Sequence, residues 1–439
     1  MINSAIGGIP SFPYGFCLQH FLGEQPDVVS WDYSMNENGR DNTAVLEAYI
    51  RHVQAHYPQT QPMILALDNH PGRCQILQKY VAQGLLHDAL CVKKADQLFS
   101  KAQLQNELSS STLDGFVGWN DFGAPDKCPG RSSWHPKKQE HAMIAWMLAM
   151  DFAKVLETAL NMIEENPHDW KDMAKQALST KTITTFPAPL SSKLFDNDAA
   201  VNALLYGHNN DNDNDNHYHI HKVACRTSFL PAATSSTTDD LPSIVTHGLN
   251  RNAQADTILH ERTDADYAAG WVLDVSSVER QTKIKVEKCG GLGYVDMKIA
   301  LYGTFESGPL HLFLPVDEGM THADHDHDHA SDQRASHWMD SLIICEANEK
   351  RSQEACQLDQ DLRLVVGGAT VEVDRIRWIH GAGEYLKRPT CIQVPLPATA
   401  QMTQRDDGTW GLPVHIHAAA RVNRKNGACC VSHVAWEMH

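Results

Sequence analysis

Short apolar runs and helical periodicities alternate along the first part of the chain. Residues 28–33 (VVSWDY) and 63–67 (MILAL) are apolar, β-prone runs of the kind found in buried parallel strands. Between them Val45, Tyr49 and Val53 recur at i, i+4 and i+8, a spacing that predicts an amphipathic helix. The order strand, helix, strand predicts an α/β fold in which the two strands are adjacent and parallel.

A long helix is predicted to begin near Pro136, because proline is favoured at the first helical position. Its most apolar stretch, residues 143–150, has helical periodicity, so we expect a helix packed in the core. With this helix, residues 1–165 are predicted to form a three-layer α/β domain with a mainly parallel sheet.

The pattern changes to period-two alternation in the last part of the chain. Residues 295–301, 310–314 and 371–373 place apolar side chains at every second position, and turn residues separate such runs. This predicts an antiparallel β-sandwich domain over residues 226–439. Residues 166–225 are expected to be a helical and low-complexity linker.

Two polar tracts contain too few apolar residues to form a core. The first, HNNDNDNDNHYHIHK, precedes the predicted sandwich, and the second, a His/Asp-rich tract near 321–333, interrupts it. Both are predicted to be loops.

Charge and cysteine content narrow the possible partners and environment. The formal net charge is -17, which argues against nucleic acid as a partner. No apolar run approaches the roughly 18 residues of a transmembrane helix. The eleven cysteines form no CxxC pair and are compatible with several disulfides, so we expect the secretory pathway or an extracellular location. The oligomeric state cannot be read from the sequence.

Three short segments carry residues suited to acyl-transfer chemistry. His135 stands directly before a helix-starting proline, where a general base can reach a substrate; a helix-capping role is the alternative. Asn36 follows a predicted strand, where its amide can donate to an oxyanion or simply form a turn. Gly8 belongs to a glycine pair whose backbone N–H groups can approach a ligand closely. His141, six residues after His135, is expected to pack inside the helix.

Taken in order, the segments AIGG, SMNE and SSWHP resemble the glycine, asparagine and histidine elements of the SGNH (GDSL-like) hydrolase family. The stretch DVVSWDYSMNE is similar to a branch of that family found in eukaryotic microalgae. The resemblance covers roughly residues 1–160. It implies that His135 is the catalytic base and that Asn36 and Gly8 help to hold the oxyanion.

The chain departs from the family pattern at several positions. It contains no Gly-Asp-Ser, the family's nucleophile motif, so we expect either N-terminal truncation, with the first strand and a signal or anchor lost, or a member without its serine. The family's aspartate falls on Ser132, and Asp121 and Asp126 are possible substitutes nearby. Ser34 and Glu37 replace the glycine and aspartate that flank the family's asparagine.

Metal binding is the other candidate chemistry. The tract with His322, His325, His327 and His329 could chelate transition metals but is typical of a solvated loop. His415 and His417 share one face of a predicted strand and are expected to form an exposed or half-buried strand surface rather than a metal site. No metal or cofactor is predicted.

The sequence therefore predicts a carboxylic-ester hydrolase or acyltransferase lineage. The resemblance implies an O-acylated glycan or a small ester as substrate, and the missing nucleophile implies an inactive chain. The alternative is a non-enzymatic glycan-binding or surface protein whose SGNH-like domain is inert.

Overall fold

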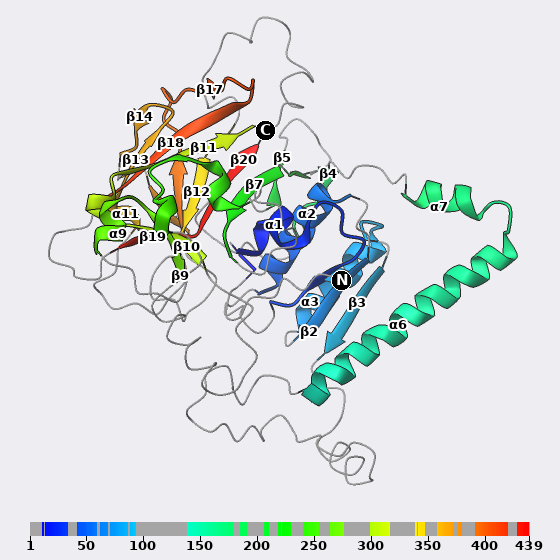
Figure 1. The fold of residues 1–439 in the computed structure, drawn as a ribbon. Helices are drawn as coiled ribbons and strands as arrows, with labels where there is room; N and C mark the ends of the chain where they lie inside the picture. The colour runs from blue at the N-terminus through cyan, green and yellow to red at the C-terminus, as the bar shows by residue number, and fades with distance from the viewer. Residues whose placement is uncertain are drawn as a thin grey trace, which may run out of the picture.

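The structure is a computed structural model. It describes the following residues: 11–12, 14–33, 42–58, 62–68, 71–86, 88–93, 138–178, 185–190, 206–209, 218–220, 222–229, 240–253, 264–275, 299–316, 339, 341–346, 358–372, 374, 376–379, 391–419 and 428–438. These residues form a mixed α/β protein with one parallel sheet and several antiparallel sheets (Figure 1).

A three-stranded parallel sheet forms near the N-terminus. Its strands β1 (Val29–Trp31), β2 (Pro62–Asp68) and β3 (Asp88–Lys93) lie in that order, and both pairings are parallel. Val29 lies opposite Met63 in the register. The prediction that the two apolar runs are adjacent, parallel strands is therefore confirmed.

Four helical elements share a buried core with β1, and α3 contacts β2 and β3 directly. They are η1 (Tyr14–Phe16), α1 (Leu18–Leu22), α2 (Asn42–His56) and α3 (Pro71–Ala82). The apolar stripe predicted for α2 is buried, with Leu46, Ile50 and Val53 each 0% exposed. Because α2 contacts α3, η1 and the later strand β7, it is buried on more than one side.

An ion pair lies inside this packing. Glu47 and Arg51 are one turn apart on α2, both side chains are 0% exposed, and Arg51 Nη2 lies 3.3 Å from Glu47 Oε1. The same carboxylate oxygen accepts from the Tyr80 hydroxyl at 2.9 Å and from the Leu190 backbone N–H at 2.7 Å. Arg51 also donates to the Pro187 carbonyl at 2.6 Å. The network attaches residues 185–190 to α2.

The segment 166–225 contains regular structure. It holds α7 (Trp170–Leu178) and a small antiparallel sheet of β4 (Thr185–Phe186), β6 (Tyr218–His219) and β5 (His208–Asn209), in that order. Strands β5 and β6 lie within the Asn/Asp-rich tract that was predicted to be a loop, so that prediction is wrong at both ends of the tract. Their paired backbones satisfy hydrogen bonds that a polar composition alone does not reveal.

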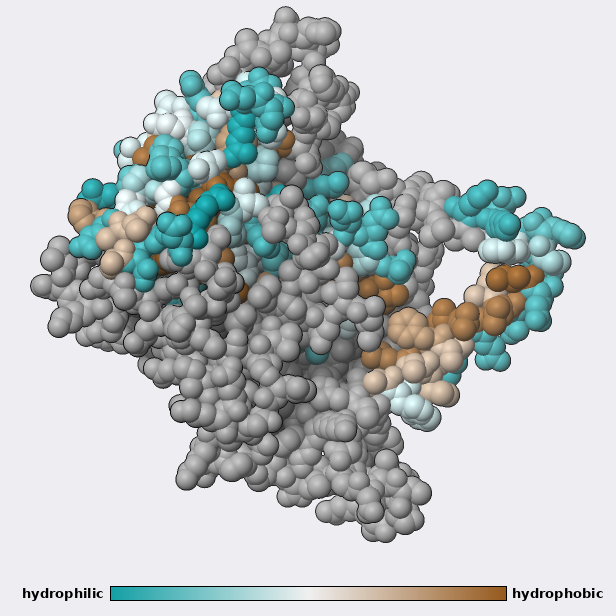
Figure 2. Space-filling view, viewed as in Figure 1, coloured by the Kyte–Doolittle hydropathy of each residue, from teal (hydrophilic) through white to brown (hydrophobic). Residues whose placement is uncertain are grey.

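The long helix α6 (Lys138–Glu165) forms as predicted but is not a core helix. Trp146 is 65% exposed and Leu156 is 60% exposed. In Figure 1 the helix runs away from the rest of the fold, and Figure 2 shows hydrophobic residues along much of its surface. The prediction of a buried helix is wrong because periodicity identifies an apolar face without identifying what it packs against.

Two larger antiparallel sheets form the second half of the chain. The six-stranded sheet contains β14 (Ala369–Thr370), β13 (Leu362–Val366), β18 (Trp410–Ala418), β11 (Pro309–Pro315) and β8 (Val245–His247) in order, with β17 (Thr403–Gln404) paired to β18. The five-stranded sheet contains β15 (Arg377–Ile379), β16 (Cys391–Pro395), β12 (Ser341–Cys345), β20 (His433–Met438) and β7 (Lys222–Thr227) in order.

Shorter elements complete this half. A third sheet has the order β19 (Cys429–Val431), β10 (Ile299–Gly303), β9 (Val272–Val275). The helical turns are η2 (Leu241–Ile244), η3 (Arg251–Ala253), α9 (Asp264–Ala268), η4 (Phe305–Ser307) and α11 (Leu358–Asp361). Every pairing between named strands here is antiparallel, which confirms the predicted strand type. The strand expected around 371–373 is β14, which ends before Val371, and the tract at 321–333 lies outside the described residues.

The five-stranded sheet is buried on both faces. Leu342 and Ile344 of β12 belong to a core shared with the six-stranded sheet. The alternate residues Ile343 and Cys345 belong to the core of α2 and β1. The α/β part therefore packs against the outer face of the sandwich, and β12 reads as an unbroken apolar run for that reason.

Candidate functional site

Gly8, Asn36 and His135, the site residues predicted from the sequence, lie outside the described residues, as do Ser34, Glu37, Asp121, Asp126 and Ser132. The structure describes the backbone of His141 within α6 but not its side chain. Their convergence stays a prediction.

The carboxyl end of β1 is close to the N-terminal segment. Tyr33 follows β1, and a Cβ atom added to Gly15 of η1 would lie 2.9 Å from the Tyr33 hydroxyl oxygen. The Tyr33 ring also lies 6.1 Å from the Tyr49 ring of α2. Tyr33 stands three residues before Asn36, so the chain leading to Asn36 contacts the segment that follows Gly8.

Asp32 is an ionisable residue at this edge that the sequence analysis did not single out. It directly follows β1, and the carboxyl ends of parallel strands face the crevice where α/β sheets bind ligands. Its side chain is exposed, yet the surrounding protein desolvates the carboxylate and raises the pKa of Asp32 to about 7. In the sequence it lies within the predicted strand run VVSWDY, where an acidic residue does not stand out.

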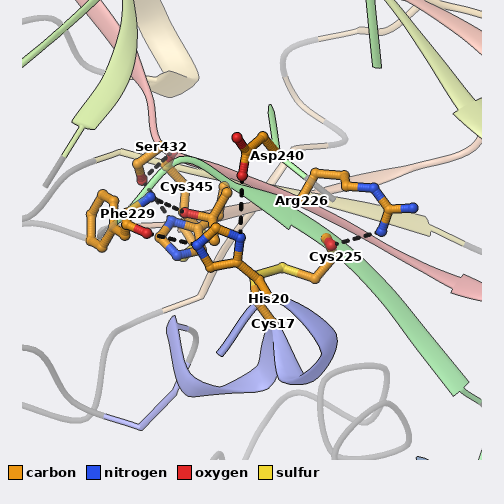
Figure 3. The surroundings of a disulfide bond; sticks show 11 residues. Cys17, His20, Cys225, Arg226, Phe229, Asp240, Cys345 and Ser432 are labelled. Carbon is orange, nitrogen blue, oxygen red and sulfur yellow. Dashed lines mark hydrogen bonds and ion pairs between the residues drawn. A yellow bond between two sulfur atoms is a disulfide. The ribbon is translucent and has the colours of Figure 1, made fainter. Parts of the chain in front are cut away.

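The junction between the α/β part and the sandwich is held by a disulfide and a histidine (Figure 3). Cys17, directly before α1, bonds to Cys225 of β7, with 4.9 Å between their Cα atoms. His20 Nε2 lies 2.6 Å from the Phe229 carbonyl oxygen, and its Nδ1 lies 3.6 Å from the Asp240 carboxylate. These contacts join residues more than 200 positions apart in the sequence.

A serine and a histidine are also neighbours at this junction, but both are buried. His433 Nδ1 lies 3.0 Å from Ser432 Oγ, and Ser432 Oγ donates to the Cys345 carbonyl at 3.0 Å. Burial, with a smaller effect of the His20 charge, lowers the pKa of His433 well below its usual value. Because Ser432 is 0% and His433 1% exposed, a substrate cannot reach them, and the pair is structural.

A surface pocket of about 320 Å³ lies on the sandwich. It is formed by residues of β8, η3, α9 and η4, and its polar lining includes Thr246, His247, Arg251 and Ser307. The imidazole of His247 and the guanidinium of Arg251 could donate to a hydroxylated ligand here, whereas the hydroxyls of Thr246 and Ser307 already donate to the His311 and Tyr267 carbonyls.

His247 also begins a row of imidazoles across three strands. His311 of β11 lies directly opposite His247 of β8 and His415 of β18. The ring centroids of His247 and His311 are 5.4 Å apart, and those of His311 and His415 are 4.1 Å apart. The predicted half-buried strand surface at His415 and His417 is confirmed. The alignment with β8 and β11 was missed because strand register cannot be read from one sequence.

Desolvation and the neighbouring imidazoles lower the pKa of His311, with His415 as the strongest of these neighbours. The pKa of His417 is lowered by desolvation, then by His415 and Arg363. Among the described residues, no group of three or more His, Cys, Asp or Glu side chains is arranged to hold a metal ion. In that same part of the chain, no helix has the length and hydropathy needed to span a bilayer.

Comparison with known proteins gives little support for a family. No family model matches the chain, and no curated protein matches it. Among solved structures, the chain is similar to one described as a two-domain esterase (CEX) active on acetylated mannans. The two share 12% sequence identity with a TM-score of 0.34, over 100% of this chain and 80% of that one. A TM-score at this level carries no argument about fold or activity.

Proposed function

We propose that this chain belongs to an ester hydrolase or acyltransferase lineage with SGNH-like layering, and that its site lies at the carboxyl edge of the β1–β2–β3 sheet. The observation that carries the proposal is the parallel pairing of β1 with β2, together with the contact between Gly15 and Tyr33. These features support an arrangement in which the Gly8 and Asn36 segments meet at one edge.

The proposed roles follow from the chemistry of each residue. His135 is the general base, and the Asn36 amide and Gly8 backbone N–H hold the oxyanion. His135 stands three residues before α6 in the sequence, and we propose that the segment leading into that helix brings it to the same edge. Asp32 at the end of β1 is a further group able to exchange a proton near neutral pH.

The nucleophile is the missing part of this site. The sequence contains no Gly-Asp-Ser, and acyl-enzyme chemistry requires a nucleophile beside the base. We therefore propose that the chain as given does not turn over esters. An O-acylated glycan is the proposed substrate class of the lineage, and the disulfides support an oxidising, secretory or extracellular location.

The test is an acetyl-ester assay on three proteins. The chain as given should show no hydrolysis of p-nitrophenyl acetate or of acetylated mannan above buffer. A version extended N-terminally by a strand ending in Gly-Asp-Ser should gain activity, and His135→Ala in that version should abolish it. His168→Ala, an exposed histidine remote from this edge in sequence, is the matched control. Activity in the chain as given that survives His135→Ala would refute the proposal.

A second candidate function is glycan binding without catalysis. It is favoured by the pocket whose lining includes His247 and Arg251, because their imidazole and guanidinium groups could donate to the hydroxyl oxygens of a glycan. If this function holds, the chain should bind mannan oligosaccharides, and Arg251→Ala should weaken binding while leaving the fold intact. Equal binding by the variant and the parent would exclude the pocket.

A further inference from the structure

The imidazoles of His247, His311 and His415 lie on the outer face of the six-stranded sheet. On β11 and β18 the alternate residues Leu310, Leu312, Val414 and Ile416 are buried in the core, so His311 and His415 point outward. His247 reaches the same face because the register between β8 and β11 shifts at an irregularity beside His311.

We propose that this row is a binding site for a divalent first-row transition metal ion, chelated between His311 and His415. Imidazole nitrogen is a preferred ligand of Zn²⁺, Cu²⁺ and Ni²⁺. A ring bound through nitrogen at about 2.0–2.1 Å has its centroid roughly 3.2 Å from the ion, so two rings on one ion have centroids about 4.5–5.2 Å apart at bond angles of roughly 90–109°. The centroid separations of 4.1 Å for His311–His415 and 5.4 Å for His247–His311 bracket this range, so small ring rotations bring either pair to it.

The geometry sets the number of protein ligands at two. Neighbouring strands are about 4.8 Å apart, so the outer rings of a three-strand row lie roughly 10 Å apart, too far for one ion to bind all three. This agrees with the lack of any three-ligand metal group in the described residues. His311 belongs to both pairs, and Arg251 lines the same pocket as His247, so its guanidinium makes the His247–His311 chelate the weaker of the two.

Electrostatic repulsion favours binding at His311 and His415 over binding at His417, the next outward-facing histidine on β18. Arg363 of β13 lies directly opposite His417 in the register and is exposed. A guanidinium beside His417 repels a dication, whereas His415 is opposed on β13 by the uncharged Val365. The open surface leaves the remaining coordination positions to water.

The test uses Cu²⁺ as the probe in a background that removes competing histidines. His322, His325, His327 and His329 of one polar tract and His217 and His221 of the other are changed to Asn in the full chain, because closely spaced histidines in either tract could bind metal by themselves. Calorimetric titration should then show a Cu²⁺ site whose electron paramagnetic resonance spectrum carries hyperfine structure from two nitrogens. Zn²⁺ should displace the copper.

Substitutions in that background separate the possible assignments. His311→Ala should weaken Cu²⁺ binding by roughly 100-fold, since losing one ring turns a chelate into a single ligand. His415→Ala should also weaken it and lose one nitrogen from the spectrum, whereas His247→Ala should have a smaller effect. His168→Ala, at an isolated exposed site, should leave binding unchanged.

Two results would overturn the proposal. One is equal Cu²⁺ affinity in His311→Ala, in His311→Gln and in the His168→Ala control. The other is a loss in His417→Ala that matches the loss in His415→Ala while His311→Ala has none, because that pattern would place the ion on β18 alone. Circular dichroism of each variant shows whether the sheet is retained, and His311→Gln keeps a polar side chain at the same position.

Discussion

The disulfide between Cys17 and Cys225 should be the most stabilising of the three described disulfides whose partners are both known. It joins residues 208 positions apart, against 46 for Cys345–Cys391 and 17 for Cys74–Cys91. In the chain-entropy description, closing longer loops restricts the unfolded chain more, which gives about 5, 4 and 3 kcal/mol respectively. Paired replacement by alanine should therefore lower the free energy of unfolding in that order.

The Cys17–Cys225 bond also links the start of α1 to β7, so its loss should increase local opening of α1. Guanidinium denaturation of each double variant, followed by circular dichroism, measures the free energy of unfolding. Hydrogen exchange should show faster opening of α1 when Cys17 and Cys225 are replaced. The reasoning fails if Cys74→Ala/Cys91→Ala destabilises the protein more, or if the Cys17→Ala/Cys225→Ala variant loses less than about 1 kcal/mol.

Three further predictions concern buried groups. Arg51→Met should cost about 3–5 kcal/mol of unfolding free energy in denaturation, because Glu47 is left charged and buried, and Glu47→Leu in the same chain should restore part of it. Gly303→Ala should cost about 1–3 kcal/mol, since its Cβ would lie 2.4 Å from the Trp271 ring; a neutral result would show that the ring moves freely. Burial lowers the pKa of His56 to about 3, with His52 and Lys222 adding to the effect. The unfolded state therefore takes up this proton first as pH falls below about 6.5, so His56 should contribute about 2 kcal/mol to the loss of stability between pH 8 and pH 5, and His56→Phe should remove that contribution.

The sequence predicted those elements whose signal is local. The runs at 28–33 and 63–67 were sufficient to identify adjacent parallel strands because they are short, β-prone and mostly apolar and are separated by a helical periodicity. The same reasoning failed for α6, where an apolar helix surface was assumed to have a packing partner. The histidine row depends on strand register and on an irregularity beside His311, neither of which leaves a mark in a single sequence.

The two proposed sites should act independently because of where the sheets lie. The α/β part packs on the outer face of the five-stranded sheet, through Ile343 and Cys345, while the histidine row lies on the outer face of the six-stranded sheet. The shared core and both sheets therefore separate them, and two packed sheets alone are about 10 Å apart. Energetic coupling of the two sites across that distance would need an element that can adopt two alternative arrangements. The sheets between the two sites are closely packed, which argues against such an element there. Metal bound at His311 should consequently leave any ester chemistry at the β1 edge unchanged, and a dependence of one on the other would mean that the two parts do not pack as described.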